Sequence, residues 1–460
     1  MLLLWGLAFI ASRIPFIFSR SGYGLDPDAY YVLLSAQKIL TTGSYSMSRP
    51  PGFPLFEILC ALLFRGGPMV TNGMTALVSC LSLIPLAGIL RLTNARSRGW
   101  LFFAFCFAPI LWIQSNCTMD YMWALFWIIL AYYLFLNRKY SWGAICLGIA
   151  VGFRISSGLM IIPFGLQIAL EERSIKKIIV PLILFGLVSL MVYSPVFLNY
   201  GLSFLRYVPY EVPVYIWGYR TMSELFGPTA FLVLTLGITA FLIAKNRERL
   251  DRNAKIWLLI ISIYILLYIK LPAETAYLIP IIPFGLILLD KILSPKLFVL
   301  FCILFVLNGV VSLAAIDKNT YRKNGLIRII PFDYGVVVKN EIRRRRIYRN
   351  ALNLSAIAEP LAGAKKTVVI IAWYEPIFHF LNQHILEEVN IEGQIRALKR
   401  KGKDLFYIES ASEEELRFLR ERQFSIYYLD AALRGKTLAK VDISKYGWQV
   451  PDIDSYPINY

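Results

Sequence analysis

Long apolar segments recur along the first 316 residues and then stop. Eleven of them approach the ~20 residues that a helix needs to cross a hydrocarbon core about 30 Å thick. They lie near 2–19, 70–91, 99–115, 119–136, 141–154, 156–170, 178–198, 227–244, 256–270, 275–290 and 297–315. Charged residues make up 17% of the chain, below the roughly 25% of soluble domains. The pattern predicts an α-helical polytopic membrane protein with about eleven transmembrane helices.

The basic residues near the segment ends indicate an orientation, because cytoplasmic loops collect Lys and Arg. With a cytoplasmic N-terminus, the inner loops 91–98, 137–140, 171–177, 245–255 and 291–296 hold fifteen of the 24 basic residues before position 317. An odd number of spans then places residues 317–460 outside. We expect a multi-pass protein of the cell's inner (plasma) membrane, with a transmembrane domain over 1–316 and an extracytoplasmic domain over 317–460.

The net charge of +18 follows from these topology signals, so we expect no nucleic-acid partner. The six cysteines lie in or beside apolar segments without a C-x-x-C pair, and the two histidines lie five positions apart in the tail. Neither pattern is typical of a disulfide framework or a transition-metal centre.

The tail differs in kind from the bundle. The segments 365–373 and 424–430 predict buried strands, and "EPIFHFLNQHILEEV" and "SEEELRFLRERQ" predict helices, the second with Ser412 and Glu415 as a capping box. Alternation of strand and helix predicts a small α/β domain. The basic run 343–346 reads as a solvated helix face or, less readily, as a contact with lipid phosphates.

The predicted outer loop 20–69, with interfacial helices that include 53–64, contains the most informative charges. Asp28 follows Pro27 at the start of a helical stretch, so it is either a helix N-cap or a functional carboxylate. Asp26 could share that task or close an Asx-turn, and two carboxylates could also bind a divalent cation. Arg49 precedes Pro50-Pro51-Gly52, a rigid setting in which a cation can hold a phosphate or serve as an interfacial anchor.

Other ionisable residues lie at the same predicted face. Arg154 interrupts apolar sequence in "GFRISSG" and needs an anionic partner there. Further candidate substrate-binding residues are Asp120, Glu211, Arg220, Glu274 and Tyr277, and Lys270 adds another cation. Charges gathered at one face beside an apolar bundle suit a substrate that is part charged and part apolar.

With these residues in view, the chain resembles the C-type glycosyltransferases that use polyprenyl-phosphate sugars, the superfamily of aminoarabinose lipid A transferases and protein O-mannosyltransferases. The resemblance rests on "PDAYYVLLSAQKILTTG", on Arg49 before Pro, on "GIAVGFRISSGLMIIP", on "IKLPAETAYLIPIIPFGLILLD" and on an acidic residue, Asp120, that opens the fourth span. It covers the eleven spans loosely. The sequence departs from the family pattern at Ala29, where an acidic residue is usual, and by the extra "AETA" between Lys270 and Tyr277.

The resemblance implies an inverting transfer of a sugar from a polyprenyl-phosphate carrier to an acceptor hydroxyl of a cell-envelope glycan, a lipid or a protein. Asp28, with Asp26 as a helper, would be the catalytic base, and Arg49, Arg154 and Lys270 would bind the donor phosphate. Because fixed cations can stabilise that leaving group, no cofactor is required, although a divalent cation could bind. The alternative is a polytopic lipid or sugar transporter or flippase, which also needs buried charges.

Overall fold

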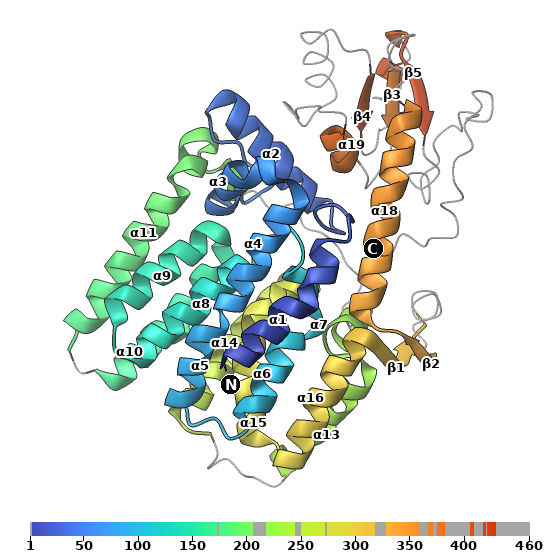
Figure 1. Cartoon of the computed structure of the whole chain (residues 1–460). Helices are drawn as coiled ribbons and strands as arrows, with labels where there is room; N and C mark the ends of the chain where they lie inside the picture. The colour runs from blue at the N-terminus through green and yellow to red at the C-terminus, as the bar shows by residue number, and fades with distance from the viewer. Residues whose placement is uncertain are drawn as a thin grey trace.

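The computed structural model describes residues 2–172, 174–205, 218–243, 250–271, 274–317, 328–358, 367–370, 375–381, 405–408, 417–419 and 421–428. A bundle of helices fills the first two thirds of the chain (Figure 1). Its α-helices are α1 (Leu2–Ile17), α2 (Asp28–Thr42), α3 (Pro54–Leu63), α4 (Gly67–Leu81), α5 (Leu83–Leu92), α6 (Arg98–Phe107), α7 (Pro109–Gln114), α8 (Tyr121–Leu136), α9 (Tyr140–Phe153), α10 (Ile161–Glu171), α11 (Lys176–Tyr200), α13 (Pro228–Ile243), α14 (Arg252–Lys270), α15 (Ile282–Ile292) and α16 (Pro295–Val310).

Three of the short helices of other types lie near the predicted functional loops. The 3-10 helices η2 (Ile155–Met160) and η6 (Thr275–Ile281) lead into α10 and α15, and the π-helix η4 (Arg220–Phe226) precedes α13. Gly227, with φ of +78°, ends η4 and lets the chain turn sharply into α13.

Among the described residues, four helical stretches are long and apolar enough to cross a membrane, and a fifth arises if the bent pair η4–α13 counts as one span. These stretches are Pro54–Leu92, Lys176–Tyr200, Arg252–Lys270 and Thr275–Ile292. Six apolar helices of 10 to 17 residues accompany them. One expected span, 99–115, is divided into α6 and α7 before Pro109, whose ring fixes φ and removes a backbone donor. The number of eleven spans stays a prediction.

The last expected span, 297–315, is wrong at its C-terminal end. Helix α16 stops at Val310, and the next residues form strand β1 (Val311–Ile316), which pairs antiparallel with β2 (Ile329–Tyr334). The β-branched pair Val310-Val311 favours the extended conformation that this hairpin uses. A hydrophobic run alone does not separate a helix end from a buried strand.

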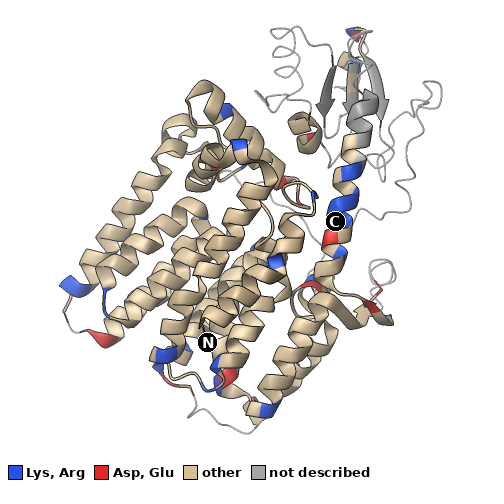
Figure 2. Cartoon of the chain, in the orientation of Figure 1, with Lys and Arg blue, Asp and Glu red and all other residues tan. Residues whose placement is uncertain are grey.

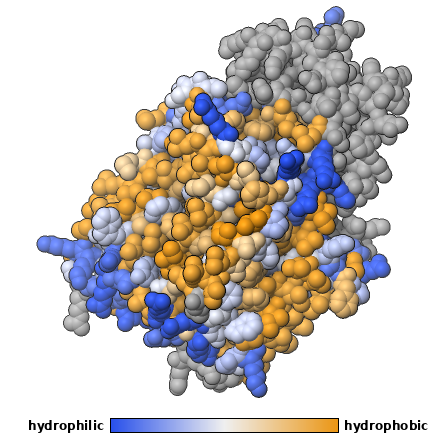
Figure 3. Space-filling model, viewed as in Figure 1, coloured by the Kyte–Doolittle hydropathy of each residue, from blue (hydrophilic) through white to orange (hydrophobic). Residues whose placement is uncertain are grey.

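Charge and hydropathy are unevenly distributed over the molecule. Lys and Arg gather at the end of the bundle where the chain begins, and another group follows the long helix α18 (Val336–Ala358) (Figure 2). Apolar surface covers the side of the bundle between these regions (Figure 3). Exposed leucines on α11 belong to this surface, among them Leu187 and Leu190, each 60% exposed. Such a surface suits contact with lipid.

The described parts of the tail agree with the predicted strand and helix types. Strands β3 (Thr367–Ile370), β4 (Leu405–Ile408) and β5 (Ser425–Tyr428) form a parallel sheet in the order β4-β3-β5. Helix α19 (Glu375–Leu381) follows β3 and packs on α2. The predicted strands near 365–373 and 424–430 are thus confirmed, whereas the capping box of Ser412 and Glu415 lies outside the described residues.

Candidate active site

Helix α2 brings the first candidate carboxylate to the end of the bundle opposite the N-terminus (Figure 1). Pro27 precedes the helix and Asp28 occupies its first turn, where the helix dipole favours an anion. The Oδ1 atom of Asp26 accepts a hydrogen bond of 3.0 Å from the backbone N–H of Asp28. Asp26 therefore makes the Asx-type contact that the sequence left open, and this contact fixes the start of α2.

A buried acid in the first part of α3, Glu57, stabilises the turn that contains Arg49. Glu57 is fully buried and accepts hydrogen bonds from the Tyr45 hydroxyl, from the backbone and hydroxyl of Ser48, and from the backbone N–H of Phe53. Four donors onto one carboxylate lock the loop that contains Arg49. Glu57 belongs to the predicted interfacial helix 53–64, and its structural role appears from these contacts.

Two arginines and two aspartates form a continuous ion network. The Nε atom of Arg49 lies 2.7 Å from Oδ2 of Asp28, and its Nη2 atom lies 3.2 Å from Oδ1 of Asp120. Arg154 Nη1 lies 2.5 Å from the other oxygen of Asp120. The Asp120 side chain is fully buried, so it depends on both arginines for charge compensation.

Aromatic rings cover the guanidinium groups of this network. The Arg49 guanidinium lies 4.3 Å from the ring centroid of Phe53. Arg154 lies 3.9 Å from the ring centroid of Tyr121 and 5.0 Å from that of Tyr277. These rings shield the cations from water and strengthen their interaction with an anion.

One donor atom in the network is left without a partner. Arg49 Nη1 is buried and has no hydrogen-bond partner within the described part of the chain. A buried guanidinium N–H without an acceptor is costly. Arg49 thus contacts two carboxylates and still offers a third donor to an incoming anion.

Glu274, at the start of η6, adds a third carboxylate to Asp26 and Asp28. One oxygen of each lies within 4.8 Å of the other two, and Glu274 accepts a hydrogen bond from the Tyr121 hydroxyl. Burial raises the pKa of Asp26 well above its usual value, and the charges of Glu274 and Asp28 raise it further. This trio could hold a proton between its members or bind a divalent cation through oxygen ligands.

Asp28 itself experiences opposing influences. Burial raises the pKa of its carboxyl group, Arg49 opposes that effect, and the nearby Glu274 reinforces it, with a raised pKa as the net result. A carboxylate whose pKa is raised is a stronger base than an exposed aspartate when it is ionised.

The four remaining candidates differ in where they lie. Tyr277 joins the arginine network through its ring. Arg220 lines a neighbouring cavity together with Asp26 and Glu274. Lys270 is exposed at the end of α14, and no described contact joins it to the network. Glu211 lies outside the described residues.

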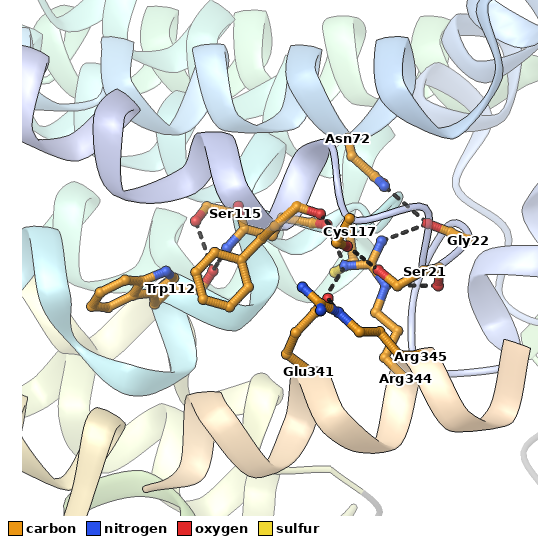
Figure 4. A network of polar contacts seen from close by, with 12 residues as sticks. Ser21, Gly22, Asn72, Trp112, Ser115, Cys117, Glu341, Arg344 and Arg345 are labelled. Atoms are coloured by element: carbon orange, nitrogen blue, oxygen red, sulfur yellow. Dashed lines mark hydrogen bonds and ion pairs between the residues drawn. The ribbon is translucent and has the colours of Figure 1, made fainter. Parts of the chain in front are cut away.

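A buried arginine of the tail was not predicted as part of this region. The run 343–346 was interpreted as a solvated face, but Arg344 is only 3% exposed and donates to the backbone oxygens of Ser21, Gly22 and Asn116 (Figure 4). The one signal in the sequence was the length of the basic run, which does not tell which member turns inward.

Comparison with known proteins gives little support of its own. No protein-family model and no curated protein matches the sequence. One similar solved structure is the Archaeoglobus fulgidus oligosaccharyltransferase in complex with zinc and sulfate, at 15% identity and a TM-score of 0.46. The alignment covers 82% of this chain and 61% of that protein, less than two thirds of its length. A likeness at this level says nothing of the activity of this chain.

Proposed function

We propose that this chain is a membrane glycosyltransferase of the C type. It would move a sugar from a polyprenyl-phosphate carrier to an acceptor hydroxyl on the extracytoplasmic face, with inversion at the anomeric carbon. The observation that carries the proposal is the pairing of Asp28 with Arg49, whose Nη1 atom is buried without a partner. A base and an anion-binding donor thus adjoin each other beside an apolar bundle.

The donor phosphate binds at Arg49 and Arg154 in this mechanism. The Nη1 atom of Arg49 donates a hydrogen bond to one phosphate oxygen, and Arg154, which shares Asp120 with Arg49, supplies a second positive charge. When the phosphate pairs with Arg49, Arg49 stabilises the ionised form of Asp28 less. The pKa of Asp28 then rises, and its carboxylate becomes a stronger base. The polyprenyl chain lies against the apolar surface of the bundle.

The transfer is a single displacement. The acceptor oxygen attacks the anomeric carbon, and Asp28 takes the proton of the acceptor hydroxyl. The bond from the anomeric carbon to the phosphate oxygen breaks, and its electron pair leaves with the polyprenyl phosphate, which Arg49 and Arg154 stabilise. Asp28 ends protonated and returns that proton to water.

The Asp28→Asn variant tests this proposal. Since general base catalysis contributes typically ~10²–10⁴-fold, we expect a rate loss of that size with full-length protein in membranes supplied with polyprenyl-phosphate sugar donors. The amide keeps the size of the side chain, so folding should persist. Full transfer by Asp28→Asn would contradict the proposal. Unchanged movement of donor lipid across vesicles by this variant, without any sugar transfer by the wild type, would favour the flippase alternative.

A further inference from the structure

A cavity of about 390 Å³ is lined by two of the three carboxylates and by none of Arg49, Asp120 and Arg154. It is bounded by the loop before α2, by η4 and η6, by the β1–β2 hairpin and by α18. Cavities that bind small molecules typically measure about 300–1,000 Å³. Asp26 and Glu274 line this cavity and also belong to the trio with Asp28. The cavity therefore adjoins the proposed base.

The acidic residues of the cavity lining come from the bundle, and most of its basic residues come from α18. The bundle contributes the carboxylates Asp26, Glu224 and Glu274 and one cation, Arg220. The cations Lys339, Arg343 and Arg344 come from one face of α18, at positions that follow each other at helical spacing. A molecule in this cavity thus meets three carboxylates and Arg220 on the bundle side, and positive charge on the α18 side, where Lys339 also pairs with Asp333.

The α18 wall is fixed with respect to Asp26. Arg344 donates to the oxygens of Ser21 at 3.2 Å, of Asn116 at 2.9 Å and of Gly22 at 2.5 Å (Figure 4). A Cβ on Gly22, whose φ is +76°, would lie 2.8 Å from the ring of Tyr348 on the same helix. Because α18 packs this tightly on the loop that leads to Asp26, the distance between the two walls is set by the fold.

We infer that this cavity binds the acceptor, and that the acceptor carries an anionic group in addition to the hydroxyl that receives the sugar. The hydroxyl lies toward Asp26 and Asp28, and the anionic group, a phosphate or a carboxylate, lies toward Lys339 and Arg343. Helix α18 is then a specificity element of the enzyme. The assignment of the ligand as the acceptor rests on the proposed function. The preference of the cavity for an anionic sugar is testable by binding measurements alone.

The experiment measures binding of glucose 6-phosphate, glucuronate and glucose by saturation-transfer difference NMR, with the full chain in a detergent that contains no sugar. A charge-assisted contact is worth about tenfold in affinity. We expect both anionic sugars to bind about tenfold more tightly than glucose, and Arg343→Gln and Lys339→Gln each to remove most of that difference. Two variants guard against the failure of one to fold.

The matched control is Arg345→Gln. It removes the same charge from the same helix, at a residue that pairs with Glu341 outside the cavity lining. We expect this variant to keep the preference for the anionic sugars. Equal binding of glucose and glucose 6-phosphate, or equal losses in Arg343→Gln and Arg345→Gln, would overturn the inference. Neither result depends on turnover, so failure here is distinct from retention of transfer by Asp28→Asn.

Discussion

Asp28 and Arg49 form an ion pair of 2.7 Å that joins the first turn of α2 to the turn before α3. The pair is only partly exposed, at 26% and 16% of the two side chains. Glu57 holds the backbone on one side of it, and on the other side Asp26 accepts a hydrogen bond from the backbone N–H of Asp28. The geometry of the proposed base is therefore set by two short loops rather than by the apolar helices that follow them.

The three donors of Arg49 make this site sensitive to the shape of the cation. In Arg49→Lys one ammonium group replaces a guanidinium that contacts Asp28 and Asp120 and leaves Nη1 for a phosphate. Hydrogen bonds to charged groups contribute about 1.5–3 kcal/mol, so we expect kcat/KM for the donor lipid to fall roughly 10–150-fold. Steady-state kinetics checks this, with the exposed Arg65→Lys as control. Equal kinetics for the two variants would exclude a bidentate role for Arg49.

Glu274 sets part of the pH dependence. Asp28 accepts a proton only when it is ionised, so the rate falls as the pH falls through its pKa. Because burial and Glu274 raise that pKa, the loss occurs at a higher pH than for an exposed aspartate. In Glu274→Gln the negative charge is gone, the pKa of Asp28 is lower, and the acid limb of the pH–rate profile moves to lower pH. Glu172→Gln, at a distant loop, should leave the limb in place, and an unmoved limb in Glu274→Gln would show that another group controls the rate.

We also predict the effect of metal removal at the carboxylate trio of Asp26, Asp28 and Glu274. Arg49 and Arg154 supply the positive charge that the leaving phosphate needs, so we expect treatment with EDTA to leave the transfer rate within about twofold. The measurement compares treated protein with protein to which Mg²⁺ or Mn²⁺ is restored. If the transfer rate disappears with EDTA and returns with one of these cations, the three carboxylates bind a divalent cation and do not share a proton.

Asp120 should matter for stability as well as for turnover. Its side chain is fully buried between Arg49 and Arg154, so Asp120→Ala leaves two cations without their shared anion. Loss of one partner of a buried pair costs about 3–5 kcal/mol. The Lys177→Gln control breaks the more exposed pair with Glu172 and should lower the melting temperature much less. Thermal unfolding in detergent checks both, and a similar shift for the two variants would contradict the proposed burial of the network.

The local parts of this site could be read from the sequence. Pro27 and Asp28 indicate the start of a helix, and Gly43, with φ of +68°, ends that helix in the structure. The rigid setting of Arg49 follows from two prolines and a glycine. The interruption by Arg154 signalled that this cation needs a partner. The end of α16 was predicted incorrectly, since hydrophobicity does not choose between helix and strand over six residues.

The partners of these residues were decided by the tertiary structure. Asp120 was a candidate, but its position between two arginines, 71 and 34 positions away, follows from how α8 packs on α9 and α9 packs on α3. The same applies to Glu274, 153 positions from Tyr121, and to Arg344, more than 300 positions from Gly22. Sequence patterns report the conformation and burial tendency of neighbouring residues. Which charges meet depends on the packing of distant segments, and electrostatic energy in a buried site changes strongly over a few ångströms.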